Sequence, residues 1–149
     1  MKKCTLALGC FWKPEENFKN KSGIINTEVG YAGGEKSEVT YEEVCTGHTG
    51  HAEVVRLTYD EKIISFKKIL DLFFKMHDPT QKDMQYPDVG TQYRSEIFYE
   101  TDEQKKEAEA VIIERNPTFD NKIQTNISKI KNYCKAEDYH QRYIEKKSI

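Results

Sequence analysis

Five short segments of the chain have the pattern of β-strands, in which apolar and polar residues tend to alternate. Successive side chains of a strand point to opposite faces, so a strand with one buried face repeats every two residues. The predicted strands cover residues 3–9, 24–31, 52–59 and 95–99, followed by a last strand with Ile123, Thr125 and Ile127.

Other segments repeat their apolar residues at helical spacing. The clearest helix has Ser65 as its N-cap, Pro79 beyond its end, and an apolar face made of Phe66, Ile69, Leu70, Phe73 and Met76. Three further helices are predicted: from Pro14 to about Lys21, from a Thr101-x-x-Gln104 capping box to near Asn116-Pro117, and a short one around Tyr139 and Tyr143.

Strands and helices mix without strict βαβ alternation, which favours an α+β fold with one mixed sheet covered by helices. The 149 residues contain no repeat and no linker-like stretch, so residues 1–149 are expected to form a single domain. Residues 78–94 have little periodicity but many aromatic and amide side chains. An irregular segment of that length in a compact domain is usually functional.

Charge and hydropathy exclude several classes of protein. The 23 basic and 25 acidic residues give a net charge of −2, so nucleic acid and anionic membranes are not expected partners. No apolar run approaches the roughly 20 residues that cross a bilayer. The first ten residues briefly imitate a signal peptide but lead into Trp-Lys-Pro-Glu-Glu rather than a cleavage site. We therefore expect a cytoplasmic protein whose four cysteines, which include no Cys-x-x-Cys pair, are free thiols.

The most distinctive local feature is a cysteine between the first strand and the first helix. At that place the amide groups and the dipole of the helix would lower the pKa of Cys10 and make it a nucleophile. Gly9 allows close backbone approach, and Phe11 and Trp12 would wall an apolar pocket beside the sulfur. The competing interpretation is an ordinary buried cysteine with two core aromatic residues.

A second cluster runs from Tyr41 to Glu53. Its Cys45-x-x-His48-x-x-His51 spacing suggests a metal site, but zinc ligands of this kind come in two pairs and no second pair follows, so no metal is predicted. Glu53 opens a predicted strand. In an apolar pocket it would have a raised pKa and hold a proton at neutral pH, whereas on a solvated edge strand it would be an ordinary carboxylate.

Seven sequence blocks in the same order resemble the A-type peptide methionine sulfoxide reductases. They are Gly9-Cys10-Phe11-Trp12, Gly30-Tyr31-Ala32-Gly33-Gly34, Tyr41-x-x-Val44-Cys45, Thr49-Gly50-His51-Ala52-Glu53, His77-Asp78-Pro79-Thr80-Gln81, Gly90-Thr91-Gln92-Tyr93-Arg94-Ser95 and Ala136-Glu137-Asp138-Tyr139-His140-Gln141. With this resemblance the expected architecture is a two-layer α/β sandwich with a ferredoxin-like core and long functional loops.

The resemblance implies a reaction and a role for each matching residue. Cys10 would attack the sulfur of methionine sulfoxide and become a sulfenic acid, and Glu53 would donate a proton to the sulfoxide oxygen. Tyr41 and Tyr93 match the tyrosines that hold the same oxygen, and Asp88 matches an acidic residue of the polar network.

Phe11 and Trp12 match the aromatic cage around the substrate methyl group. The family reduces the S epimer at sulfur, and the other epimer would leave the oxygen donors unpaired.

The resemblance also raises the question of how the sulfenic acid is reduced. Many members have a Gly-rich tail with resolving cysteines, and this sequence ends at Ile149 without one. Cys4 would have to leave its strand, and Cys45 carries no implied role, so Cys134 is the only internal candidate. We expect one working cysteine, no bound cofactor, and an external thiol as reductant (glutathione with glutaredoxin, or thioredoxin). A monomer is expected.

Two other functions remain open at this point. One is a Cys-His hydrolase or acyltransferase with Cys10 as nucleophile and His51 or His140 as base. The other is a non-enzymatic module that binds methionine or its sulfoxide through Phe11, Trp12 and Tyr93.

Overall fold

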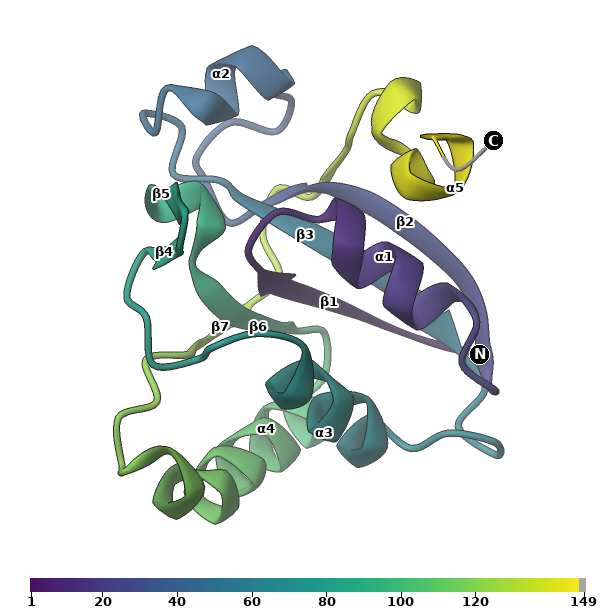
Figure 1. Cartoon of the computed structure of the whole chain (residues 1–149). Helices are drawn as coiled ribbons and strands as arrows, with labels where there is room; N and C mark the ends of the chain where they lie inside the picture. Colours follow the sequence, from purple (N-terminus) through teal and green to yellow (C-terminus); the bar gives the residue numbers. More distant parts are fainter. Residues whose placement is uncertain (148–149) are drawn as a thin grey trace.

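A computed structural model describes residues 1–147 and is organised around one six-stranded sheet in the order β7-β6-β1-β3-β2-β8 (Figure 1). The strands are β1 (Lys2–Leu8), β2 (Ile24–Ala32), β3 (Ala52–Tyr59), β6 (Ser95–Tyr99), β7 (Asn126–Lys129) and β8 (Cys134–Lys135). All neighbouring strands are antiparallel except β7, which runs parallel to β6. The sheet is therefore mixed.

The central part of the molecule is a ferredoxin-like core. From β1 the chain passes through α1 (Trp12–Lys19) to β2, and from β3 through α3 (Phe66–Met76) to β6. Each connection passes over one strand, which gives the order β6-β1-β3-β2. A further helix, α4 (Asp102–Arg115), connects β6 to β7. The predicted α+β fold, a two-layer sandwich of a mixed sheet and helices, is confirmed.

The two faces of the sheet differ in what covers them. On the helix face, Leu6 lies opposite Val55 and Ile97, and the buried apolar residues of α1, α3 and α4 pack there into one core. On the far face a separate, smaller cluster is made of Ala7, Ala32, Ala52, Val54 and Phe98. The chain crosses the far face between β7 and β8 over residues 130–133.

Two helix starts follow the capping signals in the sequence. The Ser65 hydroxyl accepts a hydrogen bond from Lys68 N at 3.0 Å, and the Thr101 hydroxyl accepts one from Gln104 N at 3.2 Å. The second motif is only half a capping box, because the Gln104 amide oxygen accepts from Glu100 N rather than from Thr101 N.

The predicted last strand is misplaced. Ile123 and Thr125 lie before β7, because Ile123 N donates to Asn116 Oδ1 and the next residue, Gln124, donates its backbone N–H to Pro79 O. These bonds tie the segment to other loops instead of to β6. Pairing starts only at Asn126, opposite Glu96.

The predicted terminal helix is interrupted. It consists of a 3-10 turn, η3 (Asp138–His140), and a short helix, α5 (Tyr143–Lys147), separated by Arg142 in a left-handed conformation with φ 53°. The expected absence of a Gly-rich tail concerns the end of the sequence, and its last two residues, Ser148 and Ile149, lie outside the described residues.

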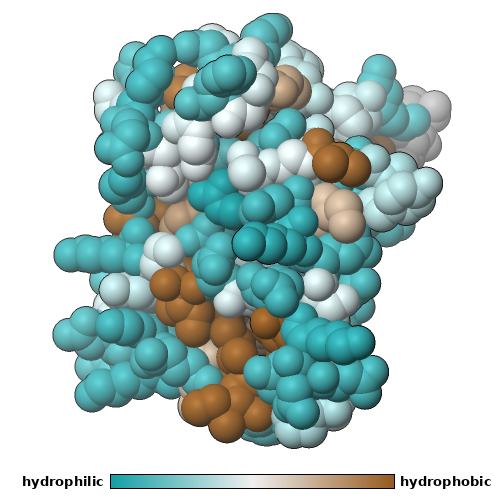
Figure 2. All heavy atoms as spheres, turned by 90° about the vertical axis from the view of Figure 1, so that its left-hand side faces the viewer, coloured by the Kyte–Doolittle hydropathy of each residue, from teal (hydrophilic) through white to brown (hydrophobic). Residues whose placement is uncertain are grey.

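The irregular segment 78–94 contains structure that the periodicity does not reveal. It holds a hairpin of β4 (Met84–Gln85) and β5 (Asp88–Val89), followed by the 3-10 turn η1 (Thr91–Tyr93). Figure 2 views the molecule from the side of this hairpin and shows a mostly hydrophilic surface, with an apolar band in its lower half. Among residues 1–147, no helix is long and apolar enough to span a membrane.

Candidate active site

The Cys10 turn lies between the end of β1 and the start of α1, as predicted. Gly9 has φ 96°, a conformation that side chains disfavour, and a Cβ there would lie 2.9 Å from the Gln85 Cγ. The glycine therefore lets the turn pack directly against the β4–β5 hairpin. The backbone N–H of Trp12, at the start of α1, donates to the Cys10 thiol.

The prediction that the helix end makes Cys10 acidic is wrong. Burial raises the pKa of the Cys10 thiol to about 12, the Trp12 N–H lowers it, and the carboxylates of Glu53 and Asp88 raise it further. One amide donor does not offset loss of water together with two nearby negative charges. At neutral pH the sulfur therefore keeps its proton.

Glu53 is buried in the centre of the sheet, not on a solvated edge. It lies on β3, directly opposite Tyr31 of β2, and is 1% exposed. Its Oε1 accepts a hydrogen bond from Phe11 N at 3.3 Å, which places the carboxyl group beside the Cys10 turn. Burial raises its pKa to about 8; the Phe11 N–H lowers it and the Asp88 carboxylate raises it. Glu53 is thus a neutral acid at pH 7.

Two tyrosines reach the same place from separate elements. Tyr41 is the first residue of α2 (Tyr41–Cys45), and Tyr93 is the last residue of η1. Burial raises the pKa of Tyr93 to about 12, with contributions from Glu53, Cys45, Asp88 and Cys10. Burial also raises the pKa of Tyr41, with Cys45 and Glu53 adding to it. Both hydroxyls therefore remain hydrogen-bond donors across the physiological range.

Asp88 is held beside these groups by the hairpin. It pairs with Gln85 across β4–β5, and residues directly opposite in a ladder point to the same side. Gln85 faces Gly9 and also clamps Asp78, accepting from its N–H at 3.1 Å and donating to its carbonyl at 2.5 Å. The structure thus brings together all five predicted polar residues.

Phe11 and Trp12 form an aromatic wall that continues into the C-terminal segment. Phe11 is buried between Tyr31 and His140, with ring centroids 5.7 and 5.1 Å away. Trp12 stacks on Tyr143 at 3.8 Å, and its indole N–H donates to His140 Nδ1 at 3.0 Å. Trp12 is therefore fixed from two sides.

Sequence reasoning missed the residue that holds Tyr41 in place. One oxygen of Glu137 accepts from Tyr41 N at 2.9 Å, and the other accepts from the Tyr31 hydroxyl at 2.8 Å. Burial tends to raise the pKa of Glu137, but these two donors help to bring it below its usual range. The helix itself had a readable signal, since Thr40 and Glu43 form a full capping box at the start of α2.

The two histidines considered as possible bases, His51 and His140, occupy structural positions. His51 is buried, with Nε2 3.3 Å from Asn132 O, and His140 accepts from Trp12. Burial lowers the pKa of both imidazoles, and within residues 1–147 neither is hydrogen-bonded to Cys10. The same residues contain no cluster of three His, Cys, Asp or Glu side chains arranged to hold a metal ion.

The three other cysteines have different surroundings. Cys4 is fully buried in β1, and burial raises its pKa far above the usual range. Cys134 lies opposite Tyr31 at the edge of the sheet, with its sulfur 3.6 Å from Val39 O. It lines a cavity of about 650 Å³ that includes no other predicted site residue. Cys45 is exposed at the end of α2, against Tyr41.

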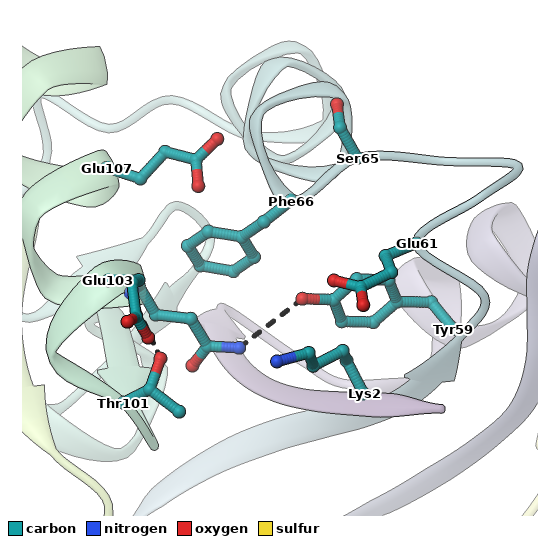
Figure 3. A pocket seen from close by; sticks show the side chains of 9 residues that line it. Lys2, Tyr59, Glu61, Ser65, Phe66, Thr101, Glu103 and Glu107 are labelled. Carbon is teal, nitrogen blue, oxygen red and sulfur yellow. Dashed lines mark hydrogen bonds between the residues drawn. The ribbon is translucent and has the colours of Figure 1, made fainter.

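A second cavity of about 360 Å³ lies at the opposite end of β1 from Cys10 (Figure 3). Lys2, Phe66 and Gln104 line it together with Glu61, Glu103 and Glu107. Gln104 donates to the Tyr59 hydroxyl at 3.4 Å within it. It contains none of the predicted site residues.

Comparison with known proteins shows to which family the chain belongs. Residues 2–149 match the family model described as "Peptide methionine sulfoxide reductase". The chain belongs to the peptide methionine sulfoxide reductase family. Peptide methionine sulfoxide reductase MsrA of Pelagibacter ubique is 56% identical over 147 residues, which are 99% of this chain and 100% of that protein. The MsrA of Campylobacter jejuni is 53% identical over 97% of this chain and 86% of its own length.

Solved structures of the family have the same fold. Reduced Mxr1 from Saccharomyces cerevisiae is 42% identical, with a TM-score of 0.93, over 99% of this chain and 86% of its own. Methionine sulfoxide reductase A of Corynebacterium diphtheriae is 33% identical, with a TM-score of 0.95, over 99% of this chain and 75% of its own. Mxr1 has also been solved in complex with Trx2. The family resemblance found in the sequence is confirmed.

Proposed function

We propose that this protein is a thiol-dependent oxidoreductase that reduces the S epimer of methionine sulfoxide in peptides to methionine. Family membership supports the reaction class. The observation that carries the residue assignment is the neutral, buried Glu53 carboxyl beside the Cys10 turn. It is a proton donor next to a sulfur nucleophile, which is what reduction of a sulfoxide requires.

In the proposed step, Glu53 passes its proton to the sulfoxide oxygen as the Cys10 sulfur bonds to the sulfoxide sulfur. The Glu53 carboxylate left behind takes up the Cys10 proton, so a thiol of high pKa becomes a nucleophile only when substrate is in place. The S–O bond of the former sulfoxide and the new S–S bond then break as the hydroxyl passes to the Cys10 sulfur. The substrate sulfur thereby gains two electrons and leaves as the thioether of methionine, while Cys10 loses two and becomes a sulfenic acid. Tyr41 and Tyr93 hold the oxygen, and Asp88 belongs to their polar network.

The substrate methyl group would lie against Phe11 and Trp12. In the other epimer the methyl group and the oxygen exchange places, so the tyrosine hydroxyls would lose their acceptor in a partly buried site. That loss supports selection of the S epimer.

Regeneration is proposed to use an external thiol. Cys4 is enclosed in the sheet, and the Cys134 sulfur is directed at the Val39 carbonyl in a different cavity. One thiol would condense with the sulfenic acid and release water, and a second would reduce the mixed disulfide. A thioredoxin fits this role, since Mxr1 binds Trx2, and so does glutathione with glutaredoxin. A cytoplasmic location and a monomeric state stay predictions.

The test is a single turnover with a stoichiometric S-sulfoxide peptide and no reductant, followed by mass spectrometry. We expect the mass of Cys10 to rise by about 16 Da in both the wild type and Cys134→Ser, because one oxygen atom is added when a thiol becomes a sulfenic acid. A loss of about 2 Da that joins Cys10 to Cys134 would overturn external resolution. Cys10→Ala should form no methionine from either epimer, and methionine formed by that variant would overturn the function assigned to Cys10.

A further inference from the structure

The carboxyl group of Glu15, on α1, is buried but has no part in the proposed reaction. The residue is 1% exposed. Its Oε2 accepts a hydrogen bond from the Thr27 hydroxyl of β2 at 2.8 Å, and its Oε1 accepts one from the backbone N–H of Arg142 at 2.7 Å. Glu15 therefore joins α1 to the sheet with one oxygen and to the C-terminal segment with the other.

The bond from Arg142 holds the C-terminal segment where it turns from η3 into α5. Arg142 has φ 53°, a left-handed conformation that is uncommon for a residue with a side chain. The side chain of the preceding residue, Gln141, accepts from Val29 N at 2.9 Å and donates to Val29 O at 2.8 Å. Two neighbouring residues thus fix the turn, one against β2 and the other against α1.

The residues on either side of this turn hold Trp12. Tyr143, directly after Arg142, stacks on the Trp12 ring with the centroids 3.8 Å apart and the planes 9° apart. His140, two residues before Arg142, accepts from the indole N–H at 3.0 Å. Helices α1 and α5 are in contact (Figure 1). Glu15 lies one helical turn after Trp12 and holds the turn between these two contacts, so it determines where the indole is held.

An ion pair also joins the two helices, but it lies at the surface. Lys19 Nζ is 3.0 Å from Glu145 Oε1, and the Glu145 side chain is 52% exposed. Ion pairs of this kind contribute little to stability, because water competes for both charges. The bond from Arg142 ends on a buried carboxyl group instead, and a hydrogen bond lost at a buried group is not replaced by water.

We propose that Glu15 is a positioning residue for the aromatic wall, which keeps the Trp12 ring in place by holding the C-terminal segment against α1. The inference rests on the proposed function, in which Trp12 contacts the methyl group of the substrate. A ring that is already fixed loses little conformational freedom when the substrate binds. Loss of the bond should therefore weaken substrate binding more than it slows the chemical step, which takes place at Cys10 and Glu53.

Trp12 is the only tryptophan of the chain, so its fluorescence reports the surroundings of this ring. Glu15→Leu accepts no hydrogen bond, and its emission should shift to longer wavelength and be quenched more strongly by acrylamide, because the freed indole meets water. Glu15→Gln can still accept from Arg142 N and can donate to the Thr27 hydroxyl, so it should keep the wild-type spectrum. Thr27→Val is the matched control, since it removes only the other hydrogen bond of Glu15, and it should also keep the spectrum.

Single turnovers without reductant, over a range of concentrations of an S-sulfoxide peptide, separate binding from the chemical step. For Glu15→Leu we expect the dissociation constant to rise about tenfold, which corresponds to about 1.4 kcal/mol of binding, and the limiting rate to change less than about threefold. In a Trp12→Ala background, Glu15→Leu should cause no further loss of binding, because both residues act through the same ring.

A Glu15→Leu variant with the wild-type emission and dissociation constant would contradict the proposal, and so would an equal loss in Thr27→Val or Glu15→Gln. Should Glu15→Leu fail to fold, Glu15→Asp is the milder variant: it keeps the carboxyl group but is one methylene shorter, and an unchanged emission spectrum in it would also contradict the proposal. A wild type that does not reduce the peptide would overturn the proposed function itself, whereas the emission spectra test the position of Trp12 independently of activity.

Discussion

The two faces of the sheet each bury a glutamate, and the two carboxyl groups serve different ends. On the helix face, Glu53 is 1% exposed and has one backbone N–H donor and no basic side chain among its partners. On the far face, Glu96 is 5% exposed, accepts from Arg94 Nε at 2.6 Å and accepts from the Ser128 hydroxyl at 2.5 Å. A glutamate that is buried without a counter-charge keeps its proton and can act as an acid, whereas a glutamate that is buried beside an arginine forms a structural ion pair.

The largest expected effect is on catalysis. Glu53→Gln keeps the shape of the side chain but has no acidic proton, so kcat/KM for an S-sulfoxide peptide should fall about 10²–10⁴-fold. Glu96→Gln, the matched control on the far face, should lower it less than about threefold. A Glu53→Gln variant within twofold of the wild type would show that the acid is not the proton donor. The measurement is methionine release under saturating reductant.

The second prediction concerns stability, for which Glu96 is expected to matter more than Glu53. Glu96→Gln leaves the Arg94 charge partly buried without its counter-ion, so the free energy of unfolding in urea should fall by about 2–3 kcal/mol. Glu53→Gln should not lower the free energy of unfolding at pH 8. If the two variants unfold at the same urea concentration, the comparison of the two faces does not hold.

A third prediction concerns the pH profile of catalysis. The pKa of Glu53 is about 8, so the acid is protonated at pH 7 and loses its proton above pH 8. We expect kcat/KM to be level below pH 7 and to decrease toward tenfold per pH unit above 8. The profile of the residual Glu53→Gln activity should lack this decrease. A wild-type rate that keeps rising through pH 9 would contradict the assignment.

The last prediction concerns the influence of Glu53 on stability. Its pKa is raised from 4.5 in the unfolded chain to about 8 in the fold. Both states hold the proton below pH 4.5, and between pH 4.5 and 8 only the folded state does, so the unfolded state is favoured progressively as the pH rises. Glu53→Gln removes this penalty and should be more stable than the wild type at pH 8, by at most about 4 kcal/mol for a pKa difference of about 3.5. At pH 4.5 the difference should disappear.

Much of the fold could be predicted from the sequence because local signals and burial agree there. The alternation over residues 52–59 and the apolar face behind Ser65 gave the bounds of β3 and α3. The last strand was misplaced because side chains of distant loops, such as Asn116, took the hydrogen bonds that a strand would have used. No periodicity reveals a contact of that kind.

The residues of the candidate site could be predicted from the sequence, but the direction of their pKa shifts could not. The sequence blocks named Cys10, Glu53 and Tyr93, and the fold brings them together. The pKa of Cys10 was predicted in the wrong direction, because the position of a helix end is readable from proline and acidic residues while the extent of burial is not. Glu137 was missed for a related reason, since both of its partners, Tyr31 and Tyr41, come from other elements.

Gly9 makes two distant parts of the chain depend on each other. A methyl group at this position would push against Gln85, and Gln85 shares its hairpin with Asp88. Any side chain at residue 9 would therefore widen the gap between the reactive sulfur and the acidic loop, although neither functional residue had changed. The absence of a side chain at Gly9 therefore sets how closely two segments from opposite halves of the chain can pack.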